Sequence, residues 1–131
     1  MNKLIAALAF AACSHAAWGQ VPTSIVTSAD DTTGARLAYE LKERVLSSRQ
    51  FSQRGNDTKG WLQINLVTLD PTVGKLGQST IYSAVCLWNS SVLPFPLYLG
   101  GYVGSCPVEK VVDCAQTIAA SAIQSYEASQ K

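Results

Sequence analysis

Segments with a β-strand pattern follow one another between residues 61 and 103, and this succession constrains the fold more than any other feature of the chain. From Trp61 to Leu69, leucine and isoleucine alternate with glutamine and asparagine, which is the period of a strand with one buried face. The segments 79–88 and 97–103 are rich in β-branched and aromatic residues. Gly100-Gly101 in the last segment predicts a β-bulge. We therefore expect consecutive, mostly antiparallel strands in the middle of the chain.

Helical patterns flank these strands. Residues 35–48 carry apolar side chains at helical spacing, and the preceding acids Asp30 and Asp31 suit a helix N-cap better than a catalytic carboxylate pair. Residues 109–127 repeat the helical pattern, with alanines that favour close packing on a sheet. Short strands at 24–27 and 51–53 complete the order β-α-β-β-β-β-α. The sequence predicts an α+β fold, a mostly antiparallel sheet with two helices packed on one face, in which the first strand lies parallel.

The first nineteen residues have the layout of a secretory signal peptide. A basic start at Lys3 precedes an apolar run, 4–13, and small residues lead to Gly19. The apolar run is shorter than the roughly 20 residues that span a bilayer. We expect cleavage after Gly19, which leaves residues 20–131 as a single domain. Cleavage after Ala16 and lipidation at Cys13 are the alternatives.

Export removes the only histidine, His15, with the leader. Serine and cysteine nucleophiles usually act beside a histidine base, and zinc sites usually need histidine or closely paired cysteines. We therefore predict no catalytic residue, no metal ligand and no cofactor site in the mature chain.

Charge and hydropathy also restrict the partners. Without Lys3 the chain has nine basic and nine acidic residues, whereas nucleic acids and anionic membrane surfaces attract a basic excess. No second long apolar run follows the leader, so we expect no stable membrane insertion after processing. A protein partner in the cell envelope is the expectation that remains.

Three cysteines follow the leader, and an odd number leaves one thiol unpaired within the chain. Cys106 and Cys114 are separated by a short loop that leads into the last helix, and we predict a disulfide between them. Cys86 lies in an apolar run, and we predict that it is buried and unreactive.

Aromatic side chains concentrate on the predicted sheet. In the two-residue period of a strand, Trp61 alternates with Leu62, and Trp88 alternates with Leu87. If the leucines face the helices, both tryptophans and Tyr82 lie on the open face of the sheet. Trp61, Tyr82 and Trp88 are therefore the candidate binding face, with burial in the core as the alternative.

The segment from Asp31 to Gly34, followed by residues 37–43, Ser47-Ser48 and Phe51, resembles the start of small periplasmic α+β domains. Examples are the N-terminal domain of the Tol-system propeller protein and the core of the curli-secretion lipoprotein. The chain is also similar to small secreted bacterial proteins of unknown function. The resemblance implies a non-enzymatic domain that docks or assembles in the cell envelope, and it assigns no functional residue.

These observations favour an exported bacterial protein, periplasmic or secreted, that binds another envelope protein through a sheet edge or the open face. A small-molecule or glycan binder that uses the sheet aromatics is the first alternative. A hydrolase is the second.

The leader generates the first prediction. N-terminal sequencing of the protein recovered from periplasm should show a mature chain that begins close to Gln20. A lipidated Cys13 at the N-terminus, or a retained Met1, would contradict it.

Overall fold

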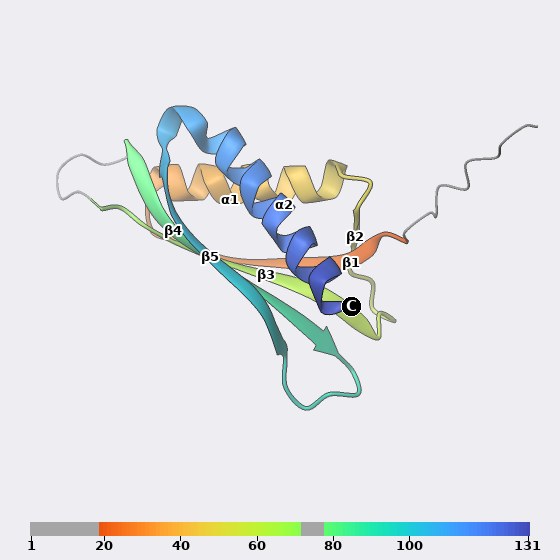
Figure 1. Cartoon of the computed structure of the whole chain (residues 1–131). Helices are drawn as coiled ribbons and strands as arrows, with labels where there is room; N and C mark the ends of the chain where they lie inside the picture. Colours follow the sequence, from red (N-terminus) through yellow and green to blue (C-terminus); the bar gives the residue numbers. More distant parts are fainter. Residues whose placement is uncertain (1–18, 72–77) are drawn as a thin grey trace, which may run out of the picture.

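The computed structural model describes residues 19–71 and 78–131, which form a five-stranded sheet and two helices (Figure 1). The predicted signal peptide and Cys13 lie outside the described residues. The elements are β1 (Val21–Ala29), α1 (Thr32–Ser47), β2 (Phe51–Gln53), β3 (Gly60–Leu69), β4 (Ser79–Ser90), β5 (Leu97–Pro107), the 3-10 turn η1 (Val108–Lys110) and α2 (Val111–Ser129). The predicted α+β class and the order of the elements are confirmed.

The strand order in the sheet is β2-β1-β3-β4-β5. The first strand, β1, is parallel to both of its neighbours, because α1 carries the chain back before β2 and β3 begin. The antiparallel ladders β3–β4 and β4–β5 each pair ten residues, against three and seven in the parallel ladders. The expectation of a mostly antiparallel sheet with a parallel first strand is therefore confirmed.

Both helices lie on the same side of the sheet and pack against each other (Figure 1). On β3, the alternation that the sequence shows places Leu62, Ile64 and Leu66 under the helices, where each is at most 1% exposed. The helices contribute one apolar stripe each to this core: Leu37, Ala38, Leu41 and Val45 from α1, and Val111, Ala115, Ile118, Ala119, Ala122 and Ile123 from α2.

Asp31 fixes the start of α1. Its carboxylate accepts a hydrogen bond from the backbone N–H of Gly34 at 2.8 Å, which caps the helix. The hydroxyls of Thr68 on β3 and Thr80 on β4 donate to the same carboxylate at 3.0 and 3.1 Å. Asp31 is only 7% exposed, so one buried acid connects the helix layer to two strands of the sheet.

The close approach at this point requires glycine at position 34. A Cβ on Gly34 would collide with the side chains of Thr68 and Asp31. Gly34 thus allows the first turn of α1 to lie directly against β3.

A register shift interrupts the β4–β5 ladder between Cys86 and Leu87, where Cys86 pairs with Gly100 but Leu87 pairs with Tyr98. The extra residue on β5 is the bulge that Gly100-Gly101 predicts.

β4 extends two residues beyond its sequence pattern, to Ser90, and two other strands extend further. β1 spans nine residues rather than four, and β5 continues to Pro107. Proline or glycine, which are depleted in strands, occur in both extensions, Pro22 in β1 and Gly104 and Pro107 in β5, and pairing with neighbouring strands extends them. Within the described ranges, no helix is both long and apolar enough to cross a membrane.

The position of Asp31 generates the second prediction. Replacement Asp31→Ala removes the cap and the acceptor of the buried Thr68 hydroxyl, and it leaves Thr80 only the longer bonds to the carbonyls of Leu69 and Ile81, so the free energy of unfolding should fall by about 2–4 kcal/mol. Urea denaturation measures the change. The adjacent exposed acid supplies the control, because Asp30→Ala should change stability by less than about 0.5 kcal/mol. Equal losses for the two variants would contradict the assigned role.

Candidate binding surfaces

The structure separates the three aromatic residues of the predicted binding face. In the β3–β4 register, Trp88 pairs with Leu62 and therefore shares the face that the helices cover. Tyr82 lies on the same covered face and is 3% exposed. Trp61 pairs with Asn89 and lies on the open face. The expectation that both tryptophans and Tyr82 share the open face is therefore wrong.

Trp88 fills the space under the end of α2. Its ring lies 5.3 Å from the ring of Tyr126 on α2, measured between centroids. The same indole covers Gly60, where a Cβ would lie 2.6 Å from a ring carbon. Trp88 is partly buried and packs against the hydrophobic core.

Tyr82 packs in a similar way over Gly104 and stacks on Tyr102, with ring centroids 5.8 Å apart. Burial, together with the neighbouring Tyr102 hydroxyl, raises the pKa of Tyr82 to about 12. Tyr82 is thus part of the core and remains protonated.

Side chains on β4 alternate between the two faces as predicted, but the helices cover the face opposite to the one that we expected. Small side chains on β4 and β5, those of Ala84, Cys86 and Gly100, lie beneath the helices, and a Cβ on Gly100 would lie 2.7 Å from the hydroxyl of Ser125. A helix that approaches a sheet closely selects small residues over leucine.

Trp61 remains on the open face, but it is covered by an arginine. The guanidinium of Arg54 lies 3.5 Å from the centroid of the indole ring. The indole nitrogen is buried and has no hydrogen-bond partner among the described residues. Trp61 is therefore a packed residue at the end of the sheet.

Cys106 and Cys114 form the pair that the sequence predicts, with Cα atoms 6.2 Å apart and a disulfide between them. The bond joins the end of β5 to the first turns of α2. Cys86 is free and 5% exposed, and burial raises the pKa of its thiol. A buried thiol with a raised pKa is a poor nucleophile.

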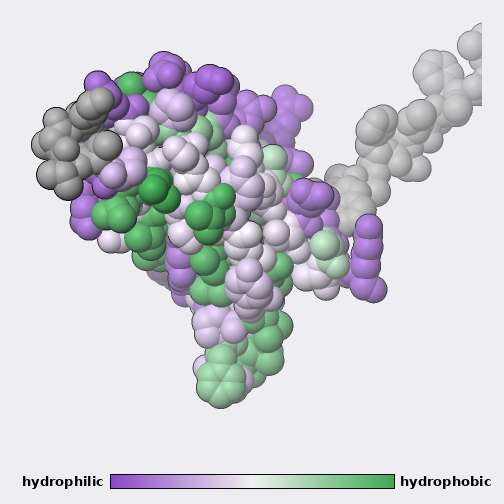
Figure 2. All heavy atoms as spheres, turned by 60° about the vertical axis from the view of Figure 1, so that its left-hand side comes forward, coloured by the Kyte–Doolittle hydropathy of each residue, from purple (hydrophilic) through white to green (hydrophobic). Residues whose placement is uncertain are grey.

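The open face of the sheet carries apolar and uncharged polar side chains. Five exposed apolar residues gather towards the end of the sheet where β3 and β4 are joined, and we call them the outer patch: Val26, Val67, Leu69, Ile81 and Val103. Figure 2 shows hydrophobic side chains on this side of the molecule and at the projecting β4–β5 loop. The sequence contains a signal for this face, because Asp70 and Lys75 are the only charged residues between Gly60 and Pro107.

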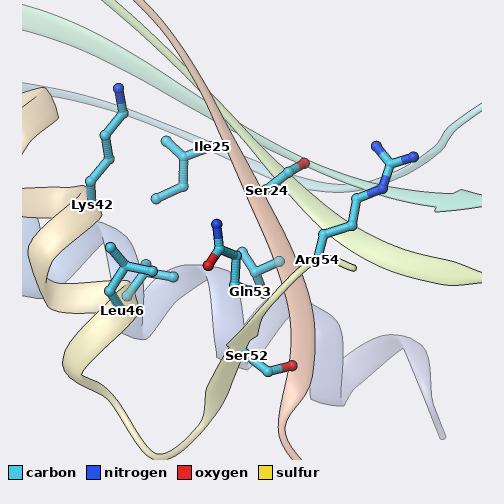
Figure 3. A pocket seen from close by; sticks show the side chains of 9 residues that line it. Ser24, Ile25, Lys42, Leu46, Ser52, Gln53 and Arg54 are labelled. Carbon is cyan, nitrogen blue, oxygen red and sulfur yellow. The ribbon is translucent and has the colours of Figure 1, made fainter. Parts of the chain in front are cut away.

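A groove lies between α1 and the edge of the sheet at β1 and β2 (Figure 3). Its volume is about 340 Å³. Ile25 on β1 and Leu46 on α1 supply apolar walls, and Lys42 supplies positive charge. Arg54 also lines the groove, but its guanidinium points away from α1 and lies over the ring of Trp61. None of the described residues that line the groove is acidic: Thr23, Ser24, Ile25, Lys42, Val45, Leu46, Ser52, Gln53 and Arg54.

The groove borders a strand edge that is only partly occupied. The three-residue strand β2 pairs with Val21–Thr23, and the last bond between the two runs from the N–H of Arg54 to the carbonyl of Thr23. From Ser24 onward, β1 has no neighbour on this side within the described part of the chain. A sheet edge was expected as a binding surface, but the sequence does not identify this one, because the edge follows from the strand order β2-β1-β3.

No protein-family model matches the chain, and no curated protein matches it. Among solved structures, the chain is similar to a Caulobacter crescentus protein described as a "putative lipoprotein", with 13% sequence identity and a TM-score of 0.39. The match covers 82% of this chain and 92% of that one. The comparisons give no support to the resemblance to the Tol-system and curli-secretion domains.

The different positions of the two tryptophans generate the third prediction. Trp88→Ala opens a cavity under α2 and should lower the free energy of unfolding by about 3 kcal/mol or more. Trp61→Ala removes a ring at the end of the sheet and its cation–π contact, and should cost about 1 kcal/mol. Thermal or urea denaturation of both variants measures the difference. Equal destabilisation would contradict the assignment of Trp88 to the core.

Proposed function

We propose that this chain is an exported, non-enzymatic binding module of the bacterial envelope that engages another envelope protein by strand addition at the free edge of β1. The leader pattern supports export, and the Cys106–Cys114 disulfide fits an oxidising compartment. The observation that carries the proposal is the unpaired edge of β1 beside the groove.

The hydrogen-bonding groups of this edge follow from the bonds to β2. Val21 and Thr23 direct their backbone groups towards β2, through the bonds Val21 N to Gln50 O and Arg54 N to Thr23 O. Because successive residues of a strand alternate, Ile25 and Thr27 direct their N–H and C=O groups outward past the end of β2. An extended segment that binds here continues the position that β2 occupies. Such strand addition supplies main-chain hydrogen bonds as the source of affinity.

The wall of the groove indicates the side chains that a bound segment carries. Lys42 and Leu46 line the groove, and Tyr39 lies one turn before Lys42 on the same stripe of α1, just beyond the groove lining. Tyr39 and Leu46 are each 61% exposed. The rise between them is about 4.5–6 Å, close to the ~6.6 Å between alternate residues of a strand. We infer that alternate positions of the segment are apolar, acidic and apolar.

Charge on α1 supports an acidic central position. Lys42 faces the groove, whereas Glu40 and Glu43 line the hollow on the other side of the helix with Val112 of α2. The groove is therefore locally positive, although the whole chain has a net charge close to zero.

The glycan-binding alternative has less geometric support. It depends on several aromatic rings displayed together, and Trp88 and Tyr82 lie under the helices. Arg54 covers the ring of Trp61.

The edge generates the fourth prediction. Proline at position 27 removes an outward N–H but no bond to β3, so Thr27→Pro should abolish partner binding while the sheet persists. Mature protein coupled to beads is incubated with envelope extract, and bound proteins are quantified by mass spectrometry. Thr27→Ala is the matched control, since it keeps the N–H.

The wild type and Thr27→Ala should capture the same partner, and the amount of that partner bound to Thr27→Pro should be lower by at least about 10-fold. Amide hydrogen exchange of Ile25 and Thr27 should slow when that partner is added. Capture that is unchanged by Thr27→Pro, in a variant whose melting curve shows a folded domain, contradicts strand addition.

A further inference from the structure

The outer patch is an apolar surface on the face of the sheet opposite the helices. Its five side chains, those of Val26, Val67, Leu69, Ile81 and Val103, are between 41% and 72% exposed. Leu69 pairs directly with Ile81, and Val67 and Val103 both pair with Ser83. Val26 on β1 pairs with Asn65, two residues before Val67 on β3. The members therefore lie next to one another across β1, β3, β4 and β5, and no described element covers them (Figures 1 and 2).

The rest of this face is uncharged: Trp61, Val85, Leu87 and Tyr98 lie on it among serines and amides. The amide side chains are hydrogen-bonded to one another. The amide of Gln63 donates to Asn65 at 2.7 Å and accepts from Asn89 at 3.2 Å. None of the described residues that β1, β3, β4 and β5 direct towards this face is charged. When a partner covers this face, no charged side chain of the sheet is desolvated. Binding therefore avoids the large free-energy cost of burying an unpaired ion.

An uncharged face favours a second copy of this chain as its partner. A partner protein with a charged surface would bury its ions against the sheet without opposite charges to pair with them. A second copy of this chain presents the same rows of uncharged side chains, so no ion is buried. A twofold axis that lies between two stacked sheets, at about 15° to β3, places the outer patch of one copy on that of the other. The Arg54 guanidinium, over Trp61, is at the opposite end of the face and so at the rim.

The dimensions of the face fit a dimer. Four strands at about 4.8 Å spacing and ten paired residues at about 3.3 Å give a footprint of roughly 19 by 33 Å, or about 630 Å². Side-chain relief increases the accessible area above this value. A standard interface buries about 800 Å² per partner, which this face approaches.

We propose that two copies of this protein form a twofold dimer by stacking the open faces of their sheets, with the outer patches in contact. The sheets pack about 10 Å apart with strands inclined by about 30°, as in β-sandwiches. The dimer leaves the β1 edge free, because that edge projects in the plane of the sheet and its groove opens towards α1. This inference is independent of the proposed strand addition.

Sedimentation equilibrium of the mature protein, from about 1 µM to about 200 µM, tests the dimer. The wild type should approach twice its monomer mass. Val67→Glu and Val103→Glu each place two like charges in a twofold interface and should raise the dissociation constant by at least about 100-fold. The two substitutions lie on different strands, so the test remains possible if one variant fails to fold. Melting curves show which variants are folded.

Val112→Glu is the matched control, because Val112 is 58% exposed on α2, away from the sheet face. It should leave the dissociation constant unchanged. A wild-type protein that stays monomeric at the highest concentration overturns the proposal. Dimers that persist in the folded Val67→Glu and Val103→Glu variants, or that Val112→Glu also disrupts, overturn it as well.

Discussion

The carboxylate of Asp31 is the group on which the arrangement of helices and sheet depends. A buried acid is stable only when its oxygens are hydrogen-bonded, and here the partners come from the first turn of α1, from β3 and from β4. Those three donors must meet at one point, so the acid fixes the distance of α1 from the sheet. Gly34 completes the constraint, because any side chain there would separate the two layers.

The sequence was sufficient for the fold but not for the choice of face. Periodicity located both helices and all five strands, because apolar spacing reports which residues of one element share a side. It could not report which side of β4 meets the helices. That choice depends on how closely α2 approaches, and the approach is set by Ala84, Cys86 and Gly100 rather than by hydrophobicity. Trp88 was placed on the wrong face for this reason.

The open face of the sheet could be predicted from the sequence, whereas the free edge of β1 could not. The open face has a signal in the printed chain, the near absence of charge between Gly60 and Pro107. The free edge of β1 has no such signal, because it follows from the strand order β2-β1-β3 and from the brevity of β2. Edges depend on which strands are neighbours in space, and a strand pattern alone does not contain that information.

The short spacing between Cys106 and Cys114 also favours correct oxidation before the chain has folded. Loop closure becomes less probable as the number of residues to the power of about 1.5. The native pair spans eight residues, whereas Cys86 is twenty residues from Cys106 and twenty-eight from Cys114. In an unfolded chain, Cys106 and Cys114 should therefore meet roughly four times as often as Cys86 and Cys106 do. They should meet roughly seven times as often as Cys86 and Cys114 do. Once β4 is covered by the helices, Cys86 is buried and inaccessible to exchange, so oxidation errors are confined to the interval before folding.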